Sequence, residues 1–126
     1  MKLSTLMIIK AIIVIVFGIC FVVIPATVLS FYGIKLDPGG IYITRLFGAA
    51  FILLGTLLWY AKNDAGSQAL RAIVLAVFLG DIIGFVVALL GQLSGLVNPL
   101  GWLTVALYFL LALGFGYFQF KKPSTT

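Results

Sequence analysis

The chain has 126 residues, of which 63% are hydrophobic and only 9% are charged, and its mean hydropathy is +1.28. In soluble domains roughly a quarter of all residues are charged, so this composition excludes a soluble globular protein and indicates a membrane protein. The formal net charge is +5, with no histidine and with three acidic residues, all of them aspartates.

Four apolar segments follow one another along the chain. Each has about the 20 residues that a helix needs to cross the hydrocarbon core of a bilayer. None alternates with a period of two, so helices are favoured over the strands of a membrane barrel. We predict an all-α membrane protein, a four-transmembrane-helix bundle that forms a single domain over residues 1–126, with helices at 6–29, 41–60, 69–93 and 100–120.

The first segment has an alternative interpretation as a secretory signal. Lys2 and Lys10 precede an apolar stretch, and Ser30 is a small residue near its end. The uninterrupted apolar part, residues 11–29, is long for the apolar region of a signal. We therefore expect a retained transmembrane helix.

The connections between the segments are short. The first ends in Asp37-Pro38-Gly39-Gly40, which predicts a tight turn because proline fixes φ and glycine accepts positive φ. Residues 61–68 form the most polar loop, and Ser67 is placed to cap the third helix. Asn98-Pro99 favours a turn before the fourth helix.

Basic residues predict the orientation. With four helices, one side holds six of them (Lys2, Lys10, Lys62, Arg71, Lys121 and Lys122), and the other side holds Lys35 and Arg45. Because cytoplasmic loops are enriched in Lys and Arg, we expect a multi-pass inner (plasma) membrane protein with both termini in the cytoplasm. The lipid bilayer is the expected partner. The basic residues form no contiguous patch, so no nucleic acid is expected.

The chain lacks the usual groups of catalysis. Without His or Glu it has no imidazole to bind a metal or haem and no Ser-His-Asp arrangement. Cys20 is the lone cysteine and excludes an intramolecular disulfide, and no glycine pattern fits a phosphate-binding loop. We expect no enzyme, no cofactor and no metal site.

Glycines mark the third segment at Gly80, Gly84, Gly91 and Gly95. At 100° per residue these positions share one helix face and form two GxxxG units, a pattern that lets helix backbones approach closely in membranes. We expect this face to pack inside the bundle, against a second-segment surface that contains Gly48 and Gly55, with a homodimer face as the alternative.

Asp81 lies near the middle of the third segment. An ionised carboxylate at this depth needs a partner, since it costs on the order of 3 kcal/mol to insert. We predict a direct pair or a water-bridged link with Arg45, whose backbone differs in depth by about 9 Å and whose guanidinium offers forked donors. Lys10, Gln92 and Thr56 are candidates for further polar contacts, although Lys10 is also able to reach water by snorkelling.

The Arg45–Asp81 pair has two possible meanings. It is either a structural clamp that fixes the register of the helices or a proton or ligand site. The sequence does not separate the two.

Several short motifs carry a family resemblance. Pro25, Tyr32-Gly33, Arg45-Leu46-Phe47-Gly48-Ala49, Gly80-Asp81 and Gly101-Trp102 resemble small bacterial four-helix membrane proteins that are grouped as domains of unknown function. The resemblance implies an integral membrane protein and implies no activity.

These observations favour a non-catalytic membrane protein, an accessory or assembly subunit of a membrane complex. The alternative is a small proton- or cation-coupled carrier that uses Asp81. A membrane-protein partner or a homo-oligomer is compatible with both.

Overall fold

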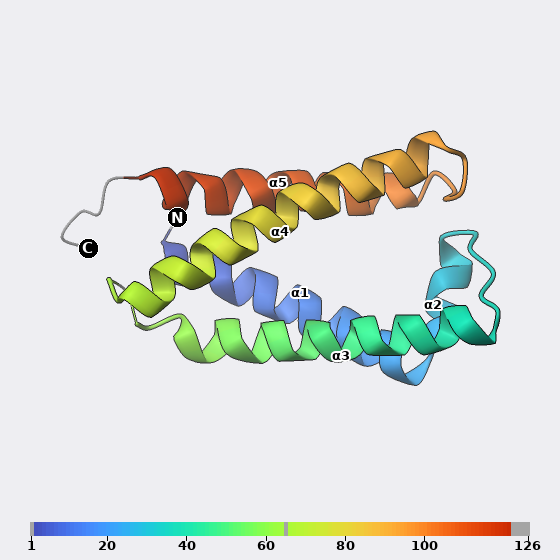
Figure 1. Ribbon diagram of the computed structural model, residues 1–126, viewed down its shortest axis with the longest axis horizontal. Helices are drawn as coiled ribbons and strands as arrows, with labels where there is room; N and C mark the ends of the chain where they lie inside the picture. Colours follow the sequence, from blue (N-terminus) through green and yellow to red (C-terminus); the bar gives the residue numbers. More distant parts are fainter. Residues whose placement is uncertain (1, 65, 122–126) are drawn as a thin grey trace.

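The computed structural model describes residues 2–64 and 66–121, and these form helices and loops (Figure 1). Four of the helices are long and apolar enough to cross a membrane, which confirms the predicted fold class. Lys122, one of the six basic residues on the side that is expected to face the cytoplasm, lies outside the described residues. The helices are α1 (Leu3–Val23), α2 (Pro25–Phe31), α3 (Pro38–Ala61), α4 (Gln68–Leu93) and α5 (Gly101–Phe120).

The first membrane segment is shorter than the predicted helix at 6–29. Helix α1 ends at Val23, and Ile24 leaves the helical region with φ −132° and ψ 56°. The break occurs because Pro25 has no N–H and restricts the residue before it, so Pro25 instead occupies the first position of α2. The prediction of one continuous helix here is wrong.

Side-chain caps begin two of the membrane helices. The Asp37 side chain accepts a hydrogen bond from Gly40 N at 2.6 Å, so Pro38 to Gly40 are the first turn of α3 and not the tight turn that was predicted. Ser67 Oγ accepts from Leu70 N at 3.0 Å, which confirms Ser67 as the cap of α4. Each cap satisfies a backbone N–H that the helix itself leaves free.

The long helices form two antiparallel pairs (Figure 1). Helix α1 packs along α3, and α4 packs along α5, whereas the two pairs touch each other much less. A core cluster joins the pairs at the end where α1 begins and α5 ends. Its buried members are Leu6, Met7, Ala11, Leu58, Leu70, Val74, Val77, Leu111 and Phe115.

Helices α1 and α3 approach each other at two glycines. A Cβ added to Gly48 would lie 2.7 Å from the carbonyl oxygen of Gly18, and a Cβ added to Gly18 would lie 2.8 Å from the carbonyl oxygen of Gly48. Gly55 lies against the Ile15 side chain, also on α1. Gly48 and Gly55 are therefore packing positions, but they face α1 and not the glycines of α4.

The glycine stripe predicted on α4 does not act as one packing surface. A Cβ on Gly80 would meet nothing within 4 Å, and one on Gly91 would only reach Val97 at 3.9 Å. Gly95 lies beyond the end of the helix with φ +81°, where glycine is favoured because it has no side chain. Only Gly84 is in close contact, with the ring of Tyr108 on α5.

Candidate functional site

Asp81 is deeply buried and forms an ion pair with Lys10. Its side chain is 1% exposed, and the Lys10 ammonium donates a hydrogen bond to Asp81 Oδ1. Lys10 itself is 5% exposed. The second oxygen, Oδ2, is buried and has no hydrogen-bond partner among the described residues.

The predicted Arg45–Asp81 pair is wrong. Arg45 is exposed, and it lies on α3, which packs along α1 and not along α4. Lys10 lies on α1, the helix between α3 and the other pair, and its side chain is buried. The depth of Arg45 in the membrane is compatible with a pair to Asp81. The packing order of the helices is not, because α3 and α4 do not pack along each other.

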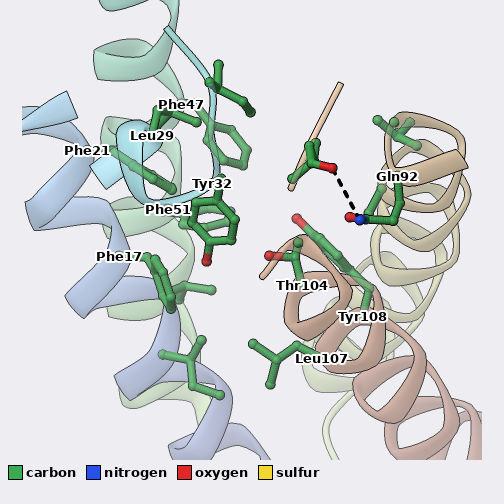
Figure 2. A pocket seen from close by; sticks show the side chains of 18 of the residues that line it. Phe17, Phe21, Leu29, Tyr32, Phe47, Phe51, Gln92, Thr104, Leu107 and Tyr108 are labelled. Atoms are coloured by element: carbon green, nitrogen blue, oxygen red, sulfur yellow. Dashed lines mark hydrogen bonds between the residues drawn. The ribbon is translucent and has the colours of Figure 1, made fainter. Parts of the chain in front are cut away.

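The other predicted polar contacts serve local structure. Thr56 Oγ1 donates to the carbonyl of Ile52 in its own helix at 2.8 Å. Gln92 Nε2 donates to the carbonyls of Val97 and Asn98 at 3.3 and 3.0 Å, and so holds the loop after α4 (Figure 2).

A cavity of about 340 Å³ lies between the two helix pairs. Lys10, Val14, Phe17 and Phe21 line it from α1, and their spacing of three to four residues places them on one helix face. From Lys10 to Phe21 the cavity follows α1 for about 16 Å. The buried ion pair therefore lies at one end of the cavity.

Aromatic rings form one wall of the cavity (Figure 2). Phe21 and Phe47 have ring centroids 5.6 Å apart, and Phe47 and Phe51 have theirs 4.3 Å apart. On the opposite wall, Thr104 and Tyr108 of α5 turn their hydroxyls toward the cavity (Figure 2). The result is an apolar space with a few polar atoms, as is typical of ligand-binding sites.

The other end of the cavity is tied by Asn98. Its side-chain amide donates to the carbonyl of Phe31 at 2.9 Å, and its backbone N–H donates to the carbonyl of Tyr32 at 2.9 Å. These bonds join the loop after α4 to the end of α2, which are far apart in the sequence. Sequence reasoning identified Asn98 only as a turn residue, and its position before Pro99 gives no sign of this contact.

Gly84 makes room for an aromatic ring, a role that its spacing from the other glycines of α4 did not predict. It lies one helical turn from Asp81, and its missing side chain leaves room for the Tyr108 ring. The close packing of this ring fixes the Tyr108 hydroxyl at the cavity wall (Figure 2).

The fold and the site define a small all-α membrane protein with a cavity between two helix pairs. The chain belongs to the family described as Domain of unknown function (DUF8292), whose model matches residues 1–118. No curated protein and no solved structure was found to match the chain.

Proposed function

We propose that the protein is a small, non-catalytic, proton- or cation-coupled membrane carrier. The observation that supports this proposal is a cavity between two helix pairs that are tied at each end by a different polar contact. Lys10–Asp81 ties one end, and Asn98 with Phe31 and Tyr32 ties the other. Breaking one of these contacts while the other stays formed would expose the cavity to one side of the membrane at a time.

The packing of the helices is compatible with such a motion. Each pair is closely packed within itself, as at Gly18 and Gly48, whereas few contacts join the pairs. Rigid-body rocking of one packed unit against another is a common basis of alternating access. Asp81 is the candidate coupling group, because ionisable side chains inside a membrane mark ion and substrate pathways in many transporters.

We also propose an orientation. The start of α1, the loop between α3 and α4, and the end of α5 lie at the same end of the molecule (Figure 1). This end carries Lys2, Lys62, Arg71 and Lys121. By the positive-inside bias it faces the cytoplasm, and the membrane is the inner membrane.

The orientation predicts opposite labelling of two loops. In a Cys20→Ser background, Lys35→Cys is expected to react with an impermeant thiol reagent added outside intact cells, and Lys62→Cys only after the cells are opened. External labelling of Lys62→Cys without labelling of Lys35→Cys would reverse the orientation.

Alternating access is tested by two further single cysteines in the same background. Thr104→Cys lines the cavity and is expected to react from the side of α2, faster when Asn98→Ala removes the side-chain bond to Phe31. Val77→Cys lies in the core cluster at the other end and is expected to react slowly from the cytoplasmic side. Asn63→Ala, in the loop between α3 and α4, is the control for Asn98→Ala.

The accessory-subunit interpretation is the alternative proposal. It requires no opening of the core cluster, so Val77→Cys would stay unreactive from both sides. It also requires a membrane-protein partner that co-purifies in fixed stoichiometry. These two results together would replace the carrier proposal.

A further inference from the structure

We propose that the cavity binds an amphipathic organic anion, and that each anion enters together with one proton that is held by Asp81. This proposal rests on the proposed carrier function and adds the substrate class and the coupled ion. It is carried by the charge of the cavity lining, the buried ion pair and the free oxygen of Asp81.

The lining of the cavity selects the sign of the ligand. Lys10 is the charged residue among the described residues that line it, whereas Asp81, which is paired with Lys10, does not line it. An ammonium has three donors, and Asp81 Oδ1 accepts one of them. The remaining donors of Lys10 are available to a carboxylate, sulfonate or phosphate group of a ligand.

The rest of the cavity selects the body of the ligand. The wall opposite α4 and α5 is formed by phenylalanine rings of α1 and α3, including Phe17 and Phe51 (Figure 2). Rings of this kind favour an apolar and flat body, which they contact by offset stacking or by their edges. The Thr104 and Tyr108 hydroxyls can bind one more polar atom on that body.

Charge balance in the occupied site requires one proton. Lys10 and Asp81 together are neutral, and an added anion would leave one uncompensated negative charge in a site that is shielded from water, at a high cost in free energy. A proton on Asp81 restores neutrality. Asp81 becomes a carboxylic acid, Lys10 stays charged, and the anion replaces the Asp81 carboxylate as the ionic partner of the Lys10 ammonium. No other bond forms or breaks.

The structure provides a position for this proton. Asp81 Oδ2 is buried and has no hydrogen-bond partner among the described residues, so a lone pair is free to accept it. The titratable groups that face Asp81 are Lys10 from α1 and the Tyr108 phenol from α5. No titratable group of α3 is found among the partners of Asp81 in residues 2–64 and 66–121.

The proposal is tested with naphthalene-2-sulfonate, a two-ring anion that stays charged across the physiological pH range. Isothermal titration of the full-length protein in lipid nanodiscs, at neutral pH and in two buffers of different ionisation enthalpy, gives the number of protons taken up per bound anion. The expected number is one. The dissociation constant of the anion is expected to rise by about tenfold for each unit by which the pH is raised, because one proton is bound with each anion. Empty nanodiscs correct for partition into lipid.

Matched probes and variants sharpen the test. Naphthalene-2-methanol and trimethyl(2-naphthyl)ammonium have the same rings, and both are expected to bind at least about tenfold more weakly than the anion. Asp81→Asn is expected to bind the anion without proton uptake. Arg45→Gln, which changes an exposed cation outside the cavity, is expected to behave like the original chain.

Zero proton uptake by the original chain would overturn the proposal even if Asp81→Asn fails to fold. Tighter binding of the ammonium probe than of the sulfonate would overturn the ligand class. This binding test does not depend on transport. If Val77→Cys never opens but one proton is still taken up per anion, the carrier proposal fails and the binding proposal stands.

Discussion

Lys10→Met is expected to lower the free energy of unfolding by about 3–5 kcal/mol, since it leaves the buried Asp81 carboxylate without its counter-charge. Removing one member of a buried pair is more damaging than removing both, because the remaining charge has neither water nor a partner. Equilibrium unfolding in mixed detergent micelles measures the change.

Arg45→Met is the matched control for Lys10→Met. It also replaces a cation by methionine, but at an exposed position, and its effect is expected to stay within about 0.5 kcal/mol. The double variant Lys10→Met, Asp81→Asn is expected to be more stable than the sum of the two single effects predicts, because the pair is coupled. Equal losses for Lys10→Met and Arg45→Met, with additive effects in the double variant, would show that Lys10 is not paired.

Gly48→Ala is expected to destabilise the protein by roughly 1–3 kcal/mol, the range typical of overpacking. The new Cβ would lie 2.7 Å from the Gly18 carbonyl oxygen and 2.9 Å from Phe21 Cβ. A backbone carbonyl cannot rotate away as a flexible side chain does, so α1 and α3 must separate. The melting temperature in detergent is expected to fall.

Gly80→Ala provides the comparison for Gly48→Ala. It makes the same chemical change inside a membrane helix, but its Cβ would meet nothing within 4 Å. Its melting temperature is expected to equal or slightly exceed that of the original chain, since alanine is the better helix former. If the two variants melt alike, the close approach of α1 and α3 at Gly18 and Gly48 does not exist.

The fold class was predictable because segment length and composition determine it. A stretch of about 20 apolar residues has few alternatives to a membrane-spanning helix, so the four long helices followed directly. The break at Ile24 was also encoded in the sequence, by Pro25. A proline can either kink a helix or end it, and the sequence around Pro25 does not determine which of the two occurs.

The partner of Asp81 was only half predictable. The cost of a charge in the membrane implied that Asp81 needs a partner, and the sequence offered Arg45 and Lys10 as candidates. The choice depends on which helices are neighbours, and contacts between helices that are distant in the chain leave no mark in the hydropathy. In the structure α1 stands between α3 and the other pair, so Lys10 is within reach and Arg45 is not.

The glycine positions show a similar limit. Spacing placed Gly80, Gly84, Gly91 and Gly95 on one face, but spacing does not say whether another helix covers that face. The close approach occurs at Gly18, which is an isolated glycine in α1 without a GxxxG partner. Only the three-dimensional packing distinguishes Gly18 from Gly80.

The contact between Lys10 and Asp81 is tested most directly by rotational-echo solid-state NMR on the protein in lipid bilayers. With ¹⁵N at every lysine Nζ and ¹³C at every aspartate Cγ, one carboxyl signal is expected to show strong dephasing by a lysine nitrogen, and Asp81→Asn is expected to remove it. A sample with ¹⁵N-labelled arginine is expected to leave the same signal unchanged. Dephasing of Asp81 by arginine, or by neither residue, would contradict the Lys10–Asp81 pair at the end of the cavity and the carrier proposal built on it.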